Sequence, residues 1–139
     1  MAPITFSKQT YRGLEHFPFA REERFIEEGF FSATLKVEVA LEQFAHGKIL
    51  MVIDSLQGVR NIYAEERYKN QEEVLGLKDS VFQIDRVEND AKAIKRDFPR
   101  STPSQVIYVT QITEFNEAFV ENLKREQHHL SIEYCTPKN

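Results

Sequence analysis

The side chains best suited to chemistry are polar residues that follow three predicted strands, over 48–54, 80–84 and 105–110. They are Asp54, Ser55, Asp85, Thr110, Gln111 and Glu114. In an open α/β sheet, ligands gather outside the carboxyl ends of the strands. Two carboxylates there, Asp54 and Asp85, could hold a Mg²⁺ ion together with waters and a phosphate, as small nucleases and phosphoryl-transfer enzymes require. The competing interpretation is ordinary loop chemistry, because Asp often begins a turn.

Histidine, cysteine and glycine residues form no further recognised motif. None of the four histidines (His16, His46, His128 and His129) pairs with another at the i, i+4 spacing of a helical zinc site. His128 and His129 are interpreted as polar groups at the end of a helix. Cys135 has no base near it in the sequence, which favours an inert buried thiol over a nucleophile. Glycine-rich phosphate loops are absent, so no cofactor is expected, apart from Mg²⁺ under the enzyme alternative.

The segment over 1–31 is unusually rich in aromatic residues. It holds seven of the 16 aromatic side chains in less than a quarter of the chain. Because aromatic residues and arginine are enriched in the cores of protein interfaces, Phe17, Phe19, Arg21 and Phe25 are candidate contacts to another protein or to a second copy. In the competing interpretation the segment folds back and seals one edge or face of the sheet. A twofold dimer that buries the segment would satisfy both interpretations.

Composition and charge are those of one ordinary globular domain. The 139 residues include 18 basic and 22 acidic side chains and carry a formal net charge of −4. We predict a single domain over 1–139, with 1–31 as an N-terminal arm. The charge is spread evenly, which disfavours nucleic-acid binding, because that needs a basic face. No apolar run approaches the roughly 18 residues that span a bilayer, and neither a signal peptide nor a cysteine pair is present. We therefore predict a cytoplasmic protein without a membrane contact.

Hydrophobic periodicity predicts helices that alternate with strands from residue 34 onward. The remaining predicted elements are a strand over 4–6, irregular chain over 8–19, a helix over 21–28, a mostly helical stretch over 58–75, a helix over 90–97, a helix that opens at 113–116 and a strand over 130–134. Such alternation is typical of an α/β fold with a mainly parallel sheet and helices packed on it. Residues 33–46 show both helical and strand spacing, so the alternative is an α+β sandwich in which 33–54 form a hairpin.

Two functions of different classes are compatible with these observations. The leading hypothesis is a small cytoplasmic regulatory protein that acts through protein–protein contacts as a homodimer; enzymatic activity is disfavoured but left open. It depends on the aromatic arm and on the absence of a specific catalytic motif. The alternative is a metal-dependent phosphoryl-transfer or nuclease-like enzyme, or a phosphate-ligand binder, with its pocket at the strand ends. Its residues are the six named at the outset.

Overall fold

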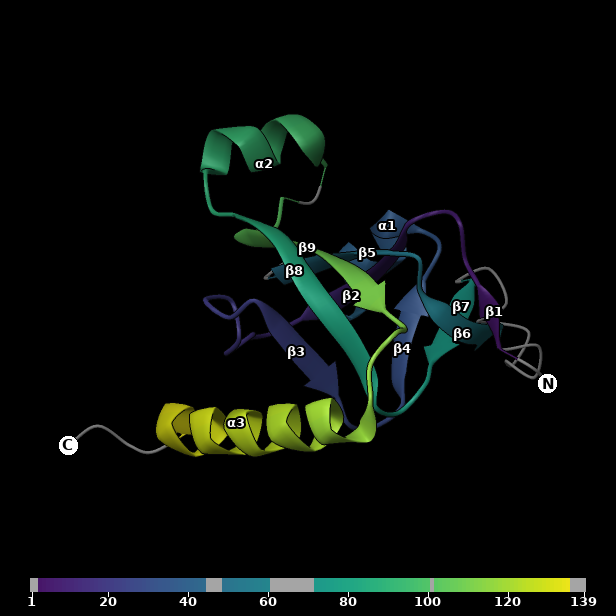
Figure 1. Cartoon of the computed structure of the whole chain (residues 1–139). Coiled ribbons are helices and arrows are strands. Elements are labelled where there is room, and N and C mark those ends of the chain that lie inside the picture. The colour runs from purple at the N-terminus through teal and green to yellow at the C-terminus, as the bar shows by residue number, and fades with distance from the viewer. Residues whose placement is uncertain (1–2, 45–48, 61–71, 101, 136–139) are drawn as a thin grey trace.

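The fold is built around one large sheet. The structure, a computed structural model, describes residues 3–44, 49–60, 72–100 and 102–135. The strands in this described part are β1 (Ile4–Thr5), β2 (Thr10–Leu14), β3 (Arg24–Glu27), β4 (Phe31–Thr34), β5 (Ile49–Asp54), β6 (Gln57–Arg60), β7 (Glu73–Gly76), β8 (Ser80–Glu88) and β9 (Gln105–Ile112). The helices are α1 (Val37–Val39), which continues into the π-helical turn η1 (Ala40–Phe44), α2 (Ala91–Asp97) and α3 (Glu117–Cys135). Figure 1 shows α3 lying along β3 at one end of the sheet, with α2 at the opposite end.

The sheet is mixed and mostly antiparallel. Its nine strands follow the order β1-β6-β7-β4-β2-β5-β9-β8-β3, and among these strands only β5 and β9 pair in parallel. The predicted α/β fold with a mainly parallel sheet is therefore wrong. The predicted hairpin over 33–54 is also absent, because β4 pairs with β2 and β7 whereas β5 pairs with β2 and β9. Alternating element types do not fix the direction of the strands, because β8 and β9 are joined through α2 and yet pair antiparallel.

The sequence misassigned three segments whose conformation depends on distant partners. The strands over 57–60 and 73–76 overlap the two ends of the stretch predicted to be helical over 58–75, while 61–71 lie outside the described residues. The predicted helix over 21–28 contains β3, and the predicted last strand over 130–134 belongs to α3. In the predicted helices over 58–75 and 21–28, neighbouring strands supply the hydrogen bonds, so strand pairing overrides local helix propensity.

The sheet curls into a half-barrel around its largest hydrophobic cluster. The rings of Phe31 on β4 and Phe82 on β8 lie 5.9 Å apart, although β2, β5 and β9 stand between those strands in the sheet. Strand alternation sends Met51 and Ile53 into this concave cluster. The intervening residues of β5 join a second cluster on the outer face, beneath α1, η1 and α2. Both faces of the central strands are thus buried.

The aromatic N-terminal segment is part of the core. Phe25 is 1% exposed, and its ring stacks on Phe82 at 5.1 Å. Phe17 packs edge-on against Phe25 at 4.9 Å and against Phe19 at 5.6 Å. Both of these partly buried rings contact the concave cluster. The segment therefore folds back and closes the mouth of the half-barrel, while Arg21 stays exposed.

Helix α3 seals the free edge of the sheet. β3 is the last strand on its side and pairs only with β8 among the described strands. The backbone N–H of Ile26 donates to Gln127 Oε1, and Gln127 Nε2 donates to the Ile26 carbonyl at 2.9 Å. A glutamine amide in this position replaces the missing strand neighbour, so it satisfies both backbone groups and blocks further strand pairing.

Candidate functional site

Arg12 is a charged side chain on the concave face of the half-barrel. It lies on β2 opposite Met51 of β5, a residue of the concave cluster. Its guanidinium carbon sits 4.9 Å from the centre of the Phe31 ring. Its Nη1 also donates to the carboxylate of Glu27 on β3. The side chains of Arg12 and Glu27 are only 19% and 25% exposed, so the sheet holds an arginine in a fixed, half-buried position.

A close strand approach keeps the Phe31 ring beneath this guanidinium. Phe31 pairs with Gly76 across β4 and β7. A Cβ atom at position 76 would overlap the Phe31 ring. Glycine is therefore required there, because it alone lets the ring lie over the neighbouring backbone. The flat ring supports the guanidinium by a cation–π contact.

A row of polar side chains crosses the same three strands. Tyr11 of β2 pairs with Thr34 of β4, which pairs with Glu73 of β7. Alternation puts this row on the face opposite Arg12. Glu72 precedes β7 in a left-handed conformation (φ 47°), and its carbonyl accepts a hydrogen bond from the Leu35 N–H. Two adjacent carboxylates thus stand at the start of β7, two strand spacings, or about 10 Å, from β2.

These groups define what the site can do chemically. A guanidinium presents a planar fork of N–H donors that matches the oxygens of a phosphate or carboxylate. Partial burial strengthens such a contact, because the surrounding medium screens charge less than water does. The carboxylates at the start of β7 can stabilise positive charge or accept a proton. The sheet therefore offers one fixed cation for an anionic ligand on its concave face and, two strands away at the start of β7, an acidic pair of which Glu73 belongs to the row on the opposite face.

Sequence reasoning did not identify this site. Arg12 stands between Tyr11 and Gly13 in a stretch predicted to be irregular, and Glu72 and Glu73 fell inside a predicted helix. The available signal was the alternation of Thr10, Arg12 and Leu14, which is typical of a short strand. Glu27 comes close to Arg12 only through the curl of the sheet.

The residues predicted at the strand ends are partly brought together. Thr110 donates a hydrogen bond of 2.6 Å to Asp85 Oδ2 and is the register partner of Asp54. Gln111 instead accepts from the Gln57 N–H at 2.7 Å. Ser55 occupies the β5–β6 connection with a left-handed backbone (φ 60°). These four predicted pocket residues and Gln111 remain candidates by position only.

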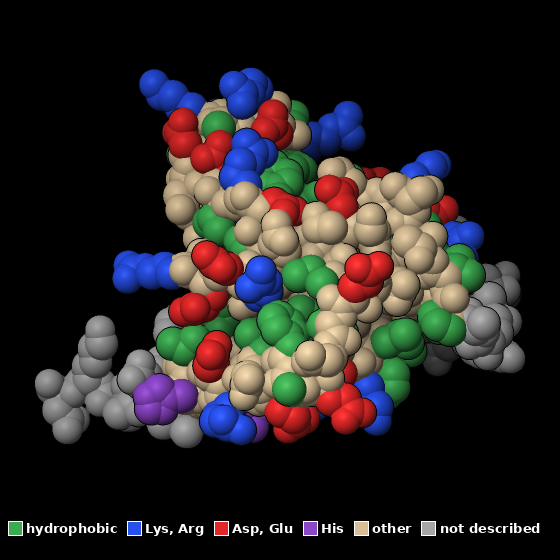
Figure 2. Space-filling view, viewed as in Figure 1, with side chains coloured by type: hydrophobic (Ala, Val, Ile, Leu, Met, Phe, Trp, Pro, Cys, Tyr) green, Lys and Arg blue, Asp and Glu red, His purple; other side chains and the backbone are tan. Residues whose placement is uncertain are grey.

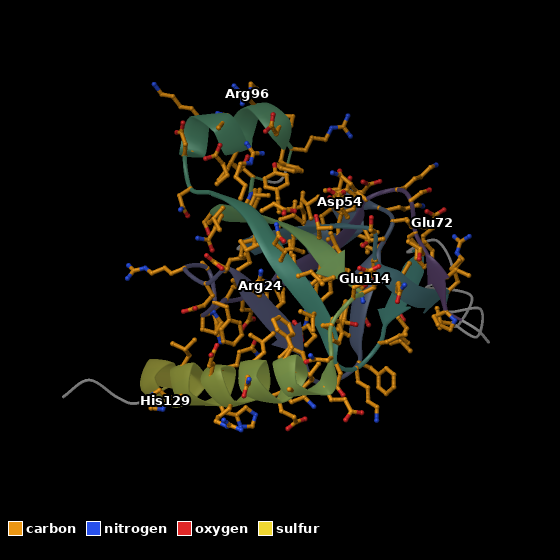
Figure 3. The ribbon with its side chains drawn as sticks, viewed as in Figure 1. Arg24, Asp54, Glu72, Arg96, Glu114 and His129 are labelled. Carbon is orange, nitrogen blue, oxygen red and sulfur yellow. The ribbon has the colours of Figure 1, made fainter. Side chains whose placement is uncertain are left out.

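Figure 3 shows that labelled charged residues such as Arg24, Glu72 and Glu114 come from different parts of the sheet. Glu114 follows β9 and lines a groove with Arg24, Phe115 and Phe119, beside α3. Glu72 lies by β6 and β7 at the other end of the sheet from β3. No group of three or more His, Cys, Asp or Glu side chains within the described residues could hold a metal ion. Cys135 is the last residue of α3, and its side chain lies outside the described part.

Tyr11 has the clearest electrostatic perturbation in this part of the sheet. It is half-buried under η1 in the outer cluster. Burial raises the pKa of its phenol, and the negative charges of Glu38 and Asp54 and the nearby Tyr108 raise that pKa further. The neutral phenol is therefore the favoured form in the folded protein.

The comparisons with known proteins identify the fold. No protein-family model and no curated protein sequence matches the chain. The solved structures that match include ADP-ribosyltransferase HopU1 of Pseudomonas syringae pv. tomato DC3000, at 20% identity and a TM-score of 0.57 over 78% of this chain and 46% of that one. Exoenzyme S of Pseudomonas aeruginosa, in complex with human 14-3-3 protein beta and bound to carba-NAD, matches at 18% identity and a TM-score of 0.56, over 83% and 56%. The type III effector XopAI of Xanthomonas axonopodis pv. citri matches at 22% identity and a TM-score of 0.54, over 78% and 45%.

The class defined by these matches is the curled, mixed sheet of bacterial ADP-ribosyltransferase toxins and effectors. This chain spans about half the length of the three structures. The predicted function as a regulatory homodimer, with its metal-dependent phosphoryl-transfer alternative, is corrected by this finding, because the structures with this fold are ADP-ribosyltransferases and effectors. Within the described residues no helix is long and apolar enough to cross a membrane. The cytoplasmic location, the single domain and the exclusion of nucleic acid stay predictions.

Proposed function

We propose that this chain is an ADP-ribosyltransferase module that binds NAD⁺ through Arg12 and transfers ADP-ribose to an acceptor. One observation carries the proposal: this chain has the fold of solved ADP-ribosyltransferases and holds on its strand β2 a largely buried arginine, which the ring of Phe31 supports. An exposed surface arginine would carry no such weight, because exposed arginines are common and weakly held.

The residues at Arg12 fit the anionic part of NAD⁺. The dinucleotide carries two linked phosphates, and a guanidinium fork binds such oxygens in a bidentate manner. The Phe31 ring fixes the plane of the fork, so little side-chain entropy remains to be lost on binding. Lysine would supply the charge without the fork, so the proposal distinguishes these two cations at position 12.

The acidic pair at the start of β7 is assigned to the chemical step. Transfer of ADP-ribose breaks the bond between the ribosyl carbon and the nicotinamide nitrogen, and positive charge develops on that carbon. A carboxylate beside it lowers the energy of that charge. We assign this role to Glu72 and Glu73 at the start of β7, which lies two strands from β2, whereas Glu27 is paired with Arg12. The departing nicotinamide takes the bond's electron pair, and the acceptor atom bonds to the ribosyl carbon as it loses its proton.

A protein is the proposed acceptor. The structures that share the fold include type III effectors and an exoenzyme in complex with another protein. In this chain, groove-lining residues of β3 and α3 include Arg24 and Phe119 together with several acidic side chains. Figure 2 shows hydrophobic and acidic side chains side by side along the line where α3 meets the sheet. A mixed surface of this kind is typical of contacts between proteins.

Two measurements test the proposal. Calorimetric titration with NAD⁺ should show binding that Arg12→Ala weakens by at least tenfold and that Arg12→Lys weakens nearly as much, whereas the exposed Arg96→Lys leaves it unchanged. Release of nicotinamide should fall about 100-fold in the double variant Glu72→Gln/Glu73→Gln. The two single variants then show which carboxylate acts, and the exposed Glu42→Gln serves as the control.

The outcomes separate binding from chemistry. Loss of turnover with unchanged NAD⁺ affinity in the glutamate variants supports their assigned role. If the wild-type chain does not bind NAD⁺ at millimolar concentration, or if Arg12→Ala binds it as tightly as the wild type, the proposal is wrong.

A further inference from the structure

We propose that Glu27 is an internal competitor that occupies the anion site of Arg12 and must swing away before a ligand phosphate can bind there. This inference deepens the proposed function and rests on it. It concerns a positioning residue that acts through Arg12 and forms no bond with the ribosyl carbon.

The contact between Arg12 and Glu27 depends on the closure of the half-barrel. β2 and β3 are separated in the sheet by β5, β9 and β8, yet the Arg12 Nη1 atom donates to the Glu27 carboxylate. The pair spans the concave face, where the side chains are 19% and 25% exposed. Burial excludes most solvent competition, so a phosphate that approaches Arg12 competes mainly with this one carboxylate.

The backbone under Glu27 is fixed, so only its side chain has to move. On one side, Ile26 is held by both hydrogen bonds of the Gln127 amide. On the other side, both carboxylate oxygens of Glu28 lie 3.2 Å from His128 Nε2. Both of those partners belong to α3, which lies along β3 (Figure 1). A glutamate side chain has three rotatable bonds, and therefore it can withdraw from Arg12 without displacing the strand.

Two roles for Glu27 predict opposite effects of removing its charge. If Glu27 competes with the ligand, its neutralisation frees the guanidinium and tightens binding. If Glu27 instead holds Arg12 in the orientation that the ligand needs, its neutralisation weakens binding. The burial of the pair favours competition, because the Phe31 ring already fixes the plane of the guanidinium and a second support adds little.

The test measures the affinity of three chains for two probes, NAD⁺ and inorganic pyrophosphate. Glu27→Gln keeps the shape of the side chain and removes its charge. We expect this variant to bind both probes about tenfold more tightly, because the free protein loses one charge-assisted contact that competes with the probe. Glu28→Gln is the matched control, because it removes the neighbouring carboxylate on the same edge and leaves Arg12 untouched. Glu27→Asp shortens the side chain by one methylene and should give an intermediate affinity.

The outcomes distinguish this inference from the proposed function. Equal or weaker binding of both probes by Glu27→Gln, with Arg12-dependent NAD⁺ binding intact, overturns the inference and leaves the function standing. Tighter pyrophosphate binding by Glu27→Gln without any NAD⁺ binding supports the shielded anion site and refutes the proposed function. If none of the three chains binds NAD⁺ or pyrophosphate, both this inference and the proposed function are refuted. If Glu27→Gln melts at a much lower temperature than the wild type, the affinity of Glu27→Asp for the probes is compared with that of the wild type instead. A higher affinity of Glu27→Asp supports competition, and an equal or lower affinity contradicts it.

Discussion

The amide of Gln127 should be one of the most important single side chains for stability. Its side chain is 7% exposed, and it holds the N–H and the C=O of Ile26 on the edge strand β3. The informative substitution is Gln127→Leu. Leucine has a similar volume and fills the space, but it can neither accept from the N–H nor donate to the carbonyl.

The loss of stability on this substitution follows from the two backbone groups of Ile26 that lose their hydrogen-bond partners. Ile26 is 3% exposed, so water does not replace the lost partners. Each unsatisfied buried group costs about 1–3 kcal/mol, while the added apolar side chain recovers part of that loss. We therefore expect the free energy of unfolding to fall by about 3 kcal/mol, which lowers Tm by about 10 °C in a chain of 139 residues.

Urea denaturation and hydrogen exchange measure the effect. Gln83→Leu is the control, because Gln83 is exposed on β8 and its amide donates to the exposed Asp85, at 3.3 Å. The amide hydrogen of Ile26 should exchange much faster in Gln127→Leu, with little change at the opposite edge of the sheet. A loss below about 1 kcal/mol with slow exchange at Ile26 would refute the reasoning, because it would mean that α3 does not seal this edge.

Three further predictions concern the interior. Thr10→Val should raise the free energy of unfolding by about 1 kcal/mol in urea denaturation, because the fully buried Thr10 hydroxyl has no hydrogen-bond partner within the described chain; a destabilised variant would show that the hydroxyl is satisfied. Gly76→Ala should lower it by about 2 kcal/mol, since the new methyl group overlaps the Phe31 ring, and should weaken any Arg12-dependent binding; an unchanged stability contradicts the proposed packing. Because the folded-state pKa of Tyr11 is raised, its contribution to stability is complete below the phenol's ordinary pKa and is lost as the pH rises through the folded value. Tyr11→Phe should therefore lose less stability between pH 9 and about 11.5 than the wild type, with absorbance at about 295 nm following the ionisation; equal losses would contradict the shift.

The parts of the fold that the sequence predicted are those in which a local pattern decides. The strand predicted over 48–54 matches β5, and those over 80–84 and 105–110 match the first parts of β8 and β9. Each is a run of β-branched and large apolar residues, which suit a buried strand in almost any surroundings. The helix predicted over 90–97 is confirmed as α2, where Asp90 accepts from the Lys92 N–H and caps the first turn.

The short strands could not be predicted, because their neighbours stabilise them. β7 consists of Glu73–Gly76 and has only two large apolar residues, but it is hydrogen-bonded on both sides, to β4 and to β6. β3 is equally short and depends on β8 and on Gln127. The intrinsic strand propensity of four residues contributes less energy than these contacts with distant strands. Pairing with distant strands also determines the direction of each strand, so the mixed sheet could not be inferred from the order of its elements.

The candidate site shows the same dependence in a stronger form. Arg12, Glu27 and Phe31 come from three strands, and none of them belongs to a recognisable motif. The Arg12–Glu27 contact exists because the sheet curls until Phe31 and Phe82 touch across its concave face. Phe25 extends that aromatic contact toward Phe17 at the mouth of the half-barrel.

The aromatic N-terminal segment folds back on the sheet, as one of the two sequence interpretations described. The segment was predicted either to seal the sheet or to bind a partner, and the structure shows it completing the aromatic stack that closes the half-barrel. Closure brings β3 toward β2, and β3 carries the carboxylate that meets Arg12. Phe17 and Phe25 thus contribute to the ring contacts on the concave face that the Arg12–Glu27 pair spans. A flat sheet of the same strands would leave Arg12 and Glu27 on separate surfaces, where solvent would screen both charges.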